Sequence, residues 1–411
     1  MRGNEAKGGF PYYIRLGDAL GLVLKELKRL PSEKVKLVES LNRVSAVDVV
    51  APFNVPPFDR AAVDGYAVRA SDTIGASELH PKRLKVVGSC VTGVRSSLLV
   101  HAGQAVEIST GAPLPKGADA VIAVERCRKE NGYVLIFEPV PRWRNVSREG
   151  EDVREGEIVL KAGKRIGPAD IGLLAACGYS EVRVSVKPTV FIIPTGTELV
   201  EPGKILHDAK VYDIDSYSIA ASVLHTGGAP VLSQRVKDDK SSIRKAIRQG
   251  LRYDMILVIG GSSVGKSDFV PSAIAEEGKL LFHGVAIRPG SPTSFGIIRG
   301  KPIFSLPGFP AGCLIAFEFL VRPALEYMLG LEEPRMKIRA KLGRTIASAL
   351  GRVDVVRVRL EQRDGTWVAY PIRITGSSVL SSVARADGFI LVPEEVERIE
   401  EGAEVEVVLC R

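Results

Sequence analysis

The stretch TVFIIPTGTELV, residues 189–200, joins an uninterrupted apolar run to a polar loop that contains glycine. An apolar run without polar alternation is typical of a strand buried on both faces of a sheet. Three similar runs follow along the chain, separated by stretches with the apolar spacing of amphipathic helices. They are PVLSQRV (230–236), DMILVIGG (254–261) and KPIFSLPG (301–308). This alternation predicts βαβ units and a parallel sheet covered on both faces, between about residues 188 and 330.

The segments before this α/β region show other patterns. GDALGLVLKELKRL (17–30) predicts a helix, and Pro31-Ser32-Glu33 predicts the start of a second helix. From about residue 50 to 165 the pattern is one of short strands between Gly and Pro, and residues 167–187 predict one short helix and a strand. The N-terminal half is therefore expected to be partly helical and largely β.

The final segment, from about residue 335, alternates like strands and has a predicted hairpin turn at Asp364-Gly365. The predicted fold class is multidomain α/β plus β. A central three-layer α/β domain is expected between a β-rich N-terminal domain and a small C-terminal β domain.

Composition limits the classes of protein to consider. A chain of 411 residues is too long for a single core, and 45% hydrophobic with 25% charged residues is ordinary globular composition. No apolar run reaches the roughly 18 residues of a membrane span, and the N-terminus lacks a signal-peptide region, so we expect a soluble, cytoplasmic protein. The net charge of +8 is spread among acids, which disfavours nucleic acid as a partner. The five cysteines show no CxxC spacing, so neither disulfides nor zinc are indicated.

Polar loops follow each strand of the predicted α/β sheet. They contain Thr195-Gly196-Thr197-Glu198, Lys237-Asp238-Asp239, the glycine-rich segment 260–268 and Leu306-Pro307-Gly308. Ligands of open α/β sheets bind beyond the carboxyl ends of the strands, and glycine-rich loops there can hold phosphate. Carboxylates in such loops suit Mg²⁺. One acid alone is better explained as a helix N-cap, but several converging on one edge favour a binding site.

Residues 260–267, GGSSVGKS, match the phosphate-binding pattern G-x-x-x-x-G-K-[ST]. In a P-loop NTPase, Lys266 would reach the β- and γ-phosphates and Ser267 would hold Mg²⁺. However, Pro271 falls where the second turn of the following helix should run, and no later apolar strand ends in a suitable aspartate. We therefore expect this loop to bind an anion in another way, and a P-loop-type NTPase is the less favoured alternative.

The N-terminal half holds a second unusual stretch, VPPFDRAAVDGYAV (55–68), in which Asp64-Gly65 interrupts an apolar strip. By itself it predicts either a hairpin turn with an exposed Asp or a loop that presents a functional acid. Its second half resembles the FD-x-SAMDGYA signature of the MoeA-like molybdopterin molybdenumtransferases, a family that includes the E domain of gephyrin. Further matching motifs follow in the family's order, so that the resemblance spans about residues 14–395. They are ISTGAPLPKGADAVIAVE (108–125), REGEDVREGEIVLKAGKRIGPADIGLLAACG (148–178), PTGTELVEPG (194–203), GGSSVGKSDF (260–269), IRPGSP (287–292) and LPGFP (306–310).

This resemblance implies a function. The family inserts molybdate, or tungstate, into adenylylated molybdopterin with release of AMP, and it requires a divalent metal such as Mg²⁺. It implies a homodimer, because the loop with the DGYA sequence closes against the α/β domain of the other subunit. The central domain is similar to the separate molybdopterin adenylyltransferase (MogA-like), which is a possible partner that supplies the substrate. Neither nucleic acid nor a membrane is an expected partner.

The resemblance also implies domain boundaries. A linking domain is expected at 14–50 and 141–187, and a β-rich domain carrying the DGYA and TGAP loops at 51–140. The α/β molybdopterin-binding domain is expected at 188–330 and the C-terminal β-barrel domain at 335–411.

The matching positions imply site residues. The implied catalytic residues are Asp64, Thr110, Asp152, Glu198, Asp238 and Asp268, of which Glu198, Asp238 and Asp268 are also the implied metal ligands. The implied substrate- and phosphate-binding residues are Gly260, Gly261, Ser263, Gly265, Lys266, Arg288, Pro307, Gly308, Ser378 and Ser381. The carboxylates would hold Mg²⁺ against the phosphoanhydride or orient water, and Arg288 with the loop amides would hold phosphate or oxyanion.

The chain departs from the family around these loops. Ser291 and Gly284 stand at positions where basic residues occur, Phe309 and Asp215 where Asn is common, Ser262 where an apolar residue is common, and Lys266 where an acid is frequent. One hypothesis is that Lys266 replaces the lost positive charge. A second interpretation of the chain is a catalytically weak paralogue that binds molybdopterin or partner proteins. The five matched carboxylates favour the enzyme, because a scaffold has no need of them.

Overall fold

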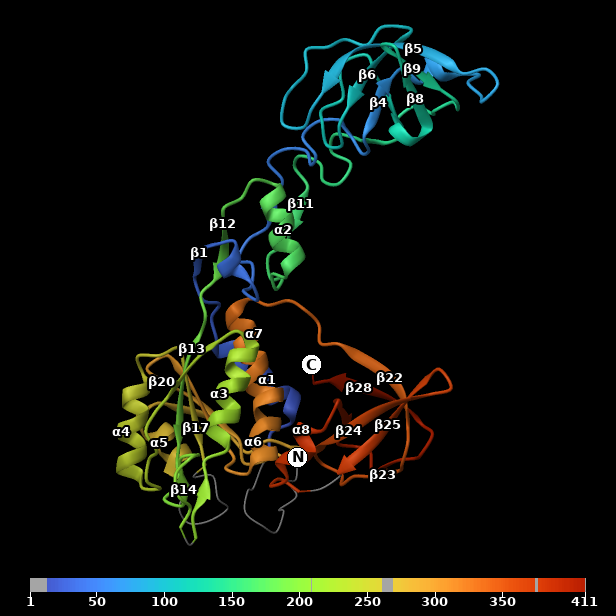
Figure 1. Ribbon diagram of the computed structural model, residues 1–411. Helices are drawn as coiled ribbons and strands as arrows, with labels where there is room; N and C mark the ends of the chain where they lie inside the picture. The colour runs from blue at the N-terminus through green and yellow to red at the C-terminus, as the bar shows by residue number, and fades with distance from the viewer. Residues whose placement is uncertain (1–12, 208, 261–268, 374–375, 411) are drawn as a thin grey trace.

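The computed structural model describes residues 13–207, 209–260, 269–373 and 376–410 (Figure 1). An arm built from the N-terminal half rises from a broader base, which contains the α/β region and a C-terminal β region (Figure 1). No helix in these described ranges is long and apolar enough to cross a membrane.

The α/β region contains a six-stranded sheet. In spatial order its strands are β16 (Ala229–Leu232), β13 (Thr189–Pro194), β17 (Met255–Ile259), β21 (Lys301–Leu306), β20 (Ser294–Ile298) and β18 (Lys279–His283). The first four are parallel, as predicted, whereas β20 runs in the opposite direction and pairs antiparallel with both β21 and β18. The reversal follows from the two-residue turn Arg299-Gly300, whose φ angles of 49° and 77° suit a tight hairpin.

Helices cover both faces of this sheet, as predicted (Figure 1). On one face, Phe191 and Ile193 of β13 pack with α4 (Lys240–Gly250) and α5 (Phe269–Glu277). On the other face, Val190 and Ile192 belong to a larger cluster with four helices. These are α1 (Leu16–Glu26), α3 (Asp215–Thr226), α6 (Pro310–Ala316) and α7 (Arg322–Leu329), with a π-helical turn at Phe317–Val321 between the last two. Alternate residues of one strand thus bury against opposite layers, which explains the uninterrupted apolar run.

One expectation about a helix was wrong. Ser32–Lys36 forms strand β1 instead of a helix, because it pairs antiparallel with β12 (Glu181–Ser185), and this tertiary pairing overrides the local helix signal. Helix α5 is described from Phe269 and contains Pro271 as its third described residue. The residues directly before Phe269 lie outside the described ranges.

The arm consists of two parts. The linking region, next to the base, contains the β1–β12 pair, helix α2 (Pro168–Ala176) and the β2–β11 pair (Val49–Val50 with Ile158–Leu160). The β-rich region at the tip is a six-stranded sheet, joined to the linking region near the β3–β10 pair (Arg60–Ala61 with Val146–Ser147). Its strands, in spatial order, are β7 (Ala120–Ala123), β4 (Gly65–Val68), β6 (Gln104–Ile108), β5 (Lys82–Cys90), β9 (Tyr133–Ile136) and β8 (Cys127–Glu130).

The C-terminal region is a closed β barrel around its own apolar cluster. The strands that close it are β24 (Val353–Arg363), β25 (Thr366–Arg373), β22 (Lys337–Leu342), β28 (Glu404–Leu409) and β26 (Gly388–Val392), with β26 pairing back to β24. Strand β19 (Ile287–Arg288) of the α/β region adds to β24 and joins the two regions. The predicted hairpin turn is confirmed, since Asp364 and Gly365 have φ angles of 47° and 75° between β24 and β25.

Small elements complete the chain. These are the 3₁₀ turns Val38–Ser40, Ala70–Thr73 and Val124–Arg126, the pair β14 (Leu199–Val200) and β15 (Val211–Tyr212), the pair β23 (Ile346–Ala347) and β27 (Arg398–Ile399), and α8 (Leu380–Ala384).

Candidate active site

Gly65 begins strand β4, which lies between β7 and β6 in the β-rich sheet. A Cβ atom at this position would lie 1.8 Å from the carbonyl oxygen of Ile122 on β7. No side chain can occupy that space, so the glycine is required by the close approach of two strands rather than by a turn. The preceding residue, Asp64, is therefore held at the exposed start of a rigid strand.

Thr110 anchors the Asp64 carboxylate. Its backbone N–H and its hydroxyl both donate to Asp64 Oδ1, at 2.6 and 2.8 Å. The backbone hydrogen bond and then the hydroxyl hydrogen bond lower the pKa of Asp64 from its ordinary value. Within the described ranges, Oδ2 has no hydrogen-bond partner. The predicted pair Asp64 and Thr110 therefore forms one unit, an ionised carboxylate with one oxygen fixed and the other available to a ligand.

Asp152 lies in the turn where the linking and β-rich regions meet. Its backbone N–H donates to Val55 at 3.1 Å, and the carboxylate is exposed. No described contact joins it to Asp64. The structure therefore places Asp152 on the arm without assigning it to the Asp64–Thr110 unit.

The carboxyl ends of the central strands meet at one edge, as predicted. The N–H of Thr195 donates to Ile259 at 2.8 Å, and the N–H of Gly260 donates to Leu306 at 3.1 Å. The N–H of Gly196 donates to Val236 at 3.1 Å, which brings in the loop after β16. Four loops that are distant in the sequence thus begin side by side.

Glycine keeps this edge free of side chains. Gly260 has a φ of 91°, and a Cβ there would lie 2.8 Å from the Thr195 carbonyl oxygen. A Cβ on Gly308 would lie 3.3 Å from Gly260 Cα. Gly260 and Gly308 thus form a surface of bare backbone, here called the glycine floor, which a ligand can approach closely. The predicted site residues Gly261, Ser263, Gly265, Lys266 and Asp268 lie outside the described residues.

Glu198 and Asp238 stand exposed at this edge, after β13 and β16. Within the described part of the chain, neither carboxylate has a hydrogen-bond partner. The described residues contain no group of three or more His, Cys, Asp or Glu that could hold a metal ion, and the third implied ligand, Asp268, is not among them.

The C-terminal region contributes a further loop. The carbonyl oxygen of Ser377 accepts the N–H groups of Ala311 and Gly312, at 2.9 and 3.2 Å. This contact docks the segment with Ser378 onto the start of α6, directly after Pro307 and Gly308. The structure thus brings these three predicted residues into one neighbourhood. Ser381 lies one turn further, on α8, and is exposed.

Arg288 is less free than predicted. Its guanidinium forms an ion pair with Asp354 on β24, whose side chain is 1% exposed and also accepts the hydroxyl of Ser348 at 2.7 Å. The Nε atoms of Arg288 and of Arg352, the residue just before β24, are buried without a hydrogen-bond partner among the described residues. Arg352 had no sequence signal, because its place depends on the pairing of β24 with β19.

Nothing in the sequence indicated that Asp213 and Asp215 form a buried acidic pair at the start of α3. Asp213 accepts the N–H of Ser216 at 3.1 Å and the Ser216 hydroxyl. Asp215 is 8% exposed, and its Oδ1 has no hydrogen-bond partner in the described structure. Burial, and secondarily the charge of Asp213, raise the pKa of Asp215 to about 7. The sequence showed only that Asp215 stands where the family commonly has Asn.

The two groups of site residues lie far apart within one chain. Strand β4, which follows Asp64, is at the tip of the arm, whereas β14, which follows Glu198, is at the opposite end of the base (Figure 1). One chain therefore carries two separate groups of candidate site residues: a fixed carboxylate on the arm, and the glycine floor with exposed carboxylates on the base.

These features define a class of protein, a multi-region α/β plus β protein with a glycine-lined sheet edge and a separate arm that carries an acid. Three family models match the chain in order. They are the MoeA N-terminal region (domain I and II) at 14–178, the "Probable molybdopterin binding domain" at 191–327 and the MoeA C-terminal region (domain IV) at 339–410.

Individual proteins match along the whole chain. The crystal structure of the molybdopterin biosynthesis MoeA protein from Pyrococcus horikoshii is 40% identical with a TM-score of 0.83, covering 97% of this chain and 99% of that chain. The molybdopterin molybdenumtransferase of Bacillus subtilis is 34% identical over 405 residues, covering 97% of this chain and 94% of the relative. The molybdopterin molybdenumtransferase of Staphylococcus aureus is 32% identical over 399 residues, covering 96% and 95%. The chain belongs to the MoeA family, which confirms the resemblance and the predicted fold class.

Proposed function

We propose that this protein is a molybdopterin molybdenumtransferase, which inserts molybdate or tungstate into adenylylated molybdopterin and releases AMP. Its class, a transferase of molybdenum cofactor biosynthesis, follows from membership of the family. The observation that carries the detailed proposal is the convergence of the loops after β13, β16, β17 and β21 on one glycine-lined edge. Such an edge suits a phosphate-bearing substrate.

The α/β region would bind and orient this substrate. The glycine floor gives a phosphate group close access to the backbone, although the N–H groups of Gly196 and Gly260 already donate to Val236 and Leu306. Arg288 with the neighbouring Arg352 supplies positive charge where the oxyanion would enter. Arg288 is already paired with Asp354, so its charge is partly offset. The exposed Phe309 and the short Ser291 border this region, and they would shape the space around the oxyanion.

The free carboxylates Glu198 and Asp238 fit a magnesium ion, because Mg²⁺ takes a few protein oxygens and completes its coordination with water and substrate phosphate. Bound there, Mg²⁺ would supply polarisation of the phosphoanhydride. In the proposed reaction water attacks the adenylate phosphorus, and the bond from that phosphorus to the bridging oxygen breaks. The bridging oxygen departs with the phosphate of molybdopterin, and the attacked phosphorus is released as AMP. The ionised Asp64 would orient the water and accept its proton.

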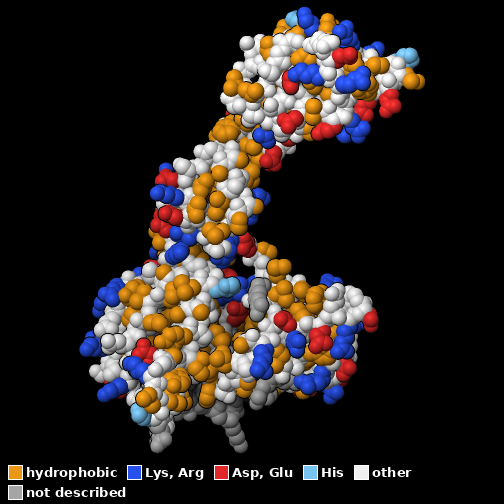
Figure 2. Space-filling view, in the orientation of Figure 1, with side chains coloured by type: hydrophobic (Ala, Val, Ile, Leu, Met, Phe, Trp, Pro, Cys, Tyr) orange, Lys and Arg blue, Asp and Glu red, His pale blue; other side chains and the backbone are white. Residues whose placement is uncertain are grey.

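This mechanism needs two chains, since β4, which follows Asp64, is at the tip of the arm and β14, which follows Glu198, is at the opposite end of the base (Figure 1). We therefore propose a two-fold homodimer in which the arm of one subunit completes the sheet edge of its partner. Exposed apolar side chains on the linking region support an association surface there (Figure 2). They include Val38, Leu41, Val50, Phe53 and Ile158, of which Val50 and Ile158 lie opposite each other in the β2–β11 pair. The molybdopterin adenylyltransferase is the proposed supplier of the substrate.

AMP release tests the activity. Purified protein is given adenylylated molybdopterin, Mg²⁺ and molybdate, beside an Asp64→Ala variant. We expect AMP only when oxyanion is present, and none from the variant. If the wild type binds the pterin but releases no AMP with molybdate or tungstate, the chain is the weak binding paralogue instead. Nucleotide hydrolysis without pterin would indicate the NTPase.

Mixed dimers test the sharing of the site. Asp64→Asn and Glu198→Gln variants are each expected to be inactive as homodimers. After unfolding and refolding together, half of the dimers are heterodimers with one intact site, so about a quarter of the wild-type activity should return. No recovery, with heterodimers verified by mass spectrometry, would place Asp64 and Glu198 in separate sites.

A further inference from the structure

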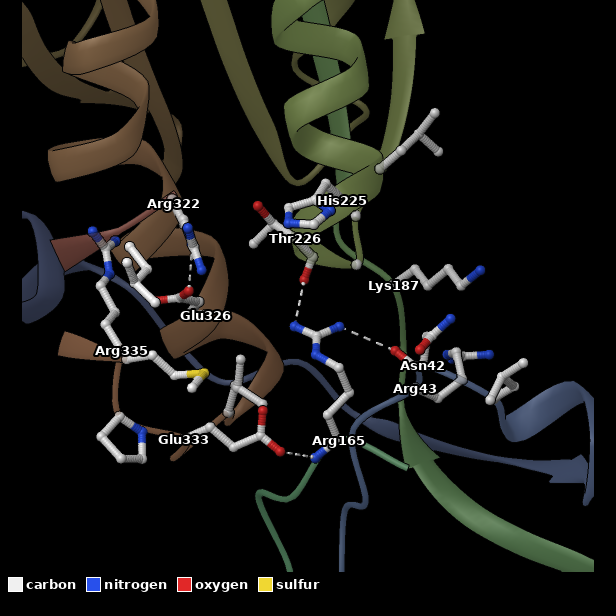
Figure 3. Close-up of a pocket in the computed structure, with 18 residues that line it drawn as sticks. Asn42, Arg43, Arg165, Lys187, His225, Thr226, Arg322, Glu326, Glu333 and Arg335 are labelled. Atoms are coloured by element: carbon white, nitrogen blue, oxygen red, sulfur yellow. Dashed lines mark hydrogen bonds and ion pairs between the residues drawn. The ribbon is translucent and has the colours of Figure 1, made fainter. Parts of the chain in front are cut away.

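A cavity of about 640 Å³ lies where the arm meets the base, away from the candidate active site (Figure 3). Asn42, Arg43 and Arg165 of the linking region line one side. The end of α3 with His225 and Thr226, and α7 with Arg322 and Glu326, line the other. The connector to the barrel, residues 331–336, completes the wall. Three parts of the molecule therefore meet around a hollow instead of a packed core.

Arg165 reaches across this hollow (Figure 3). One guanidinium nitrogen donates to the Asn42 carbonyl at 3.1 Å, within the linking region, and the other donates to the Thr226 carbonyl at 3.2 Å, at the end of α3. Its backbone N–H donates to Glu333 in the connector at 2.9 Å. A single residue is thus bonded to the arm, the α/β region and the connector. Both guanidinium partners are carbonyl groups, so the bonds are directional links rather than an ion pair.

Little else holds this joint. The apolar cluster of the linking region and the large cluster of the α/β region share no buried residue in the described chain. Among the residues that the structure describes, one further backbone bond crosses the joint, from the N–H of Glu332 to the Gly163 carbonyl at 3.0 Å. A junction without a shared apolar core permits relative motion of the parts, so its few polar bonds set the preferred orientation.

We propose that Arg165 is a positioning residue that sets the angle of the arm, and thereby where Asp64 is presented to the partner subunit. This inference rests on the proposed function. Strand β4, which begins directly after Asp64, lies in the β-rich region at the tip of the arm (Figure 1), so a small rotation at Arg165 becomes a large displacement at the Asp64 carboxylate. A displacement of about 1 Å at the reacting centre can slow an enzyme about 100-fold. Substrate binding at the glycine floor of the base does not depend on that angle.

Arg165→Ala, with Lys187→Ala as its matched control, tests the proposal. Lys187 lines the same cavity and carries the same charge, but it has no hydrogen bond or ion pair among the described residues. We expect Arg165→Ala to slow AMP release at least tenfold, with an unchanged dissociation constant for adenylylated molybdopterin. Small-angle X-ray scattering should show a broader distance distribution for this variant only. Arg165→Lys, which can restore one of the two guanidinium bonds, should recover part of the rate.

The outcomes separate this proposal from the proposed function. If Arg165→Ala releases AMP at the rate of Lys187→Ala and has the same scattering profile, the proposal is overturned. The proposal is also overturned if thermal unfolding shows that the fraction of unfolded Arg165→Ala protein accounts for the whole loss of rate, since a structural role of Arg165 would then suffice. If the wild type releases no AMP, the function fails, while the scattering comparison still decides whether Arg165 holds the arm.

Discussion

The tip of the arm and the edge of the central sheet present acids in opposite ways. Asp64 is exposed, doubly hydrogen-bonded by Thr110 and has a lowered pKa. At the sheet edge, Glu198 and Asp238 lack described partners, and the neighbouring Asp215 is buried with its pKa raised to about 7. The arm therefore presents a carboxylate whose orientation and ionisation are already fixed within one chain. The base carries a surface that a substrate and its counter-ions would complete.

The largest expected effect concerns the strand that presents Asp64. Gly65→Ala places a Cβ where the Ile122 carbonyl oxygen would be 1.8 Å away, so β4 and β7 must separate. We expect a loss on the order of 4 kcal/mol or more in the free energy of unfolding of the β-rich region, measured by urea denaturation. Gly21→Ala is the control, because nothing lies within 4 Å of its Cβ position on α1, and it should be neutral or slightly stabilising. Equal effects of the two would contradict the close-approach argument.

Asp215→Asn examines the buried acid at the base. The folded-state pKa of about 7 is above the ordinary value of 3.8, so the folded protein holds an extra proton between these values. The contribution of Asp215 to stability should therefore be lost as pH rises from about 4 to 7, so the wild type should lose stability relative to Asp215→Asn over this range. The difference in unfolding free energy between variant and wild type should shift in favour of the variant by up to about 4 kcal/mol between pH 4 and pH 8. Thermal unfolding across this range measures the gain, and the exposed Glu78→Gln serves as control. A pH-independent difference would mean that Asp215 is ionised in the fold.

Gly260→Ala alters the glycine floor itself. Its φ of 91° disfavours any Cβ, and the added atom would meet the Thr195 carbonyl oxygen at 2.8 Å. We expect about 1–3 kcal/mol of destabilisation and weaker binding of adenylylated molybdopterin. Gly300→Ala is the control for backbone strain, because Gly300 has a φ of 77° and nothing lies within 4 Å of its Cβ position. The difference in destabilisation between Gly260→Ala and Gly300→Ala therefore measures the effect of the close contact with Thr195. Unchanged pterin binding in Gly260→Ala would remove this edge from the site.

The smallest effect concerns Thr110→Val. The backbone bond to Asp64 remains and the hydroxyl bond is lost, so the pKa of Asp64 should rise part of the way to its ordinary value. A carboxylate whose pKa is lowered stays ionised to lower pH, so the acid limb of the AMP-release profile should move to higher pH in the variant. Thr110→Ser keeps a hydroxyl and should keep the wild-type profile. An unmoved acid limb in Thr110→Val would assign that limb to another group.

Sequence patterns predicted the elements whose structure is decided locally. The uninterrupted apolar strands, their covering helices and the Asp364-Gly365 turn all follow from hydrophobic pattern and backbone preference. Strand Ser32–Lys36 was missed because its structure is decided by Glu181–Ser185, which lies far away in the chain. The same limit applies to the site. Asp64 and Thr110 were named separately through the resemblance, but nothing in the sequence showed that they bond to each other.

The sequence by itself determined the family, the α/β architecture and most of the candidate site residues, because motifs and periodicity are properties of the chain alone. Tertiary structure decided the rest. It set the separation of Asp64 from the sheet edge, the burial that raises the pKa of Asp215, the pairing of Arg288 with Asp354 and the place of Arg165 at the joint. Each of these depends on groups that are distant in sequence and adjacent only in the fold. Distance, burial and angle between such groups are what set their chemistry.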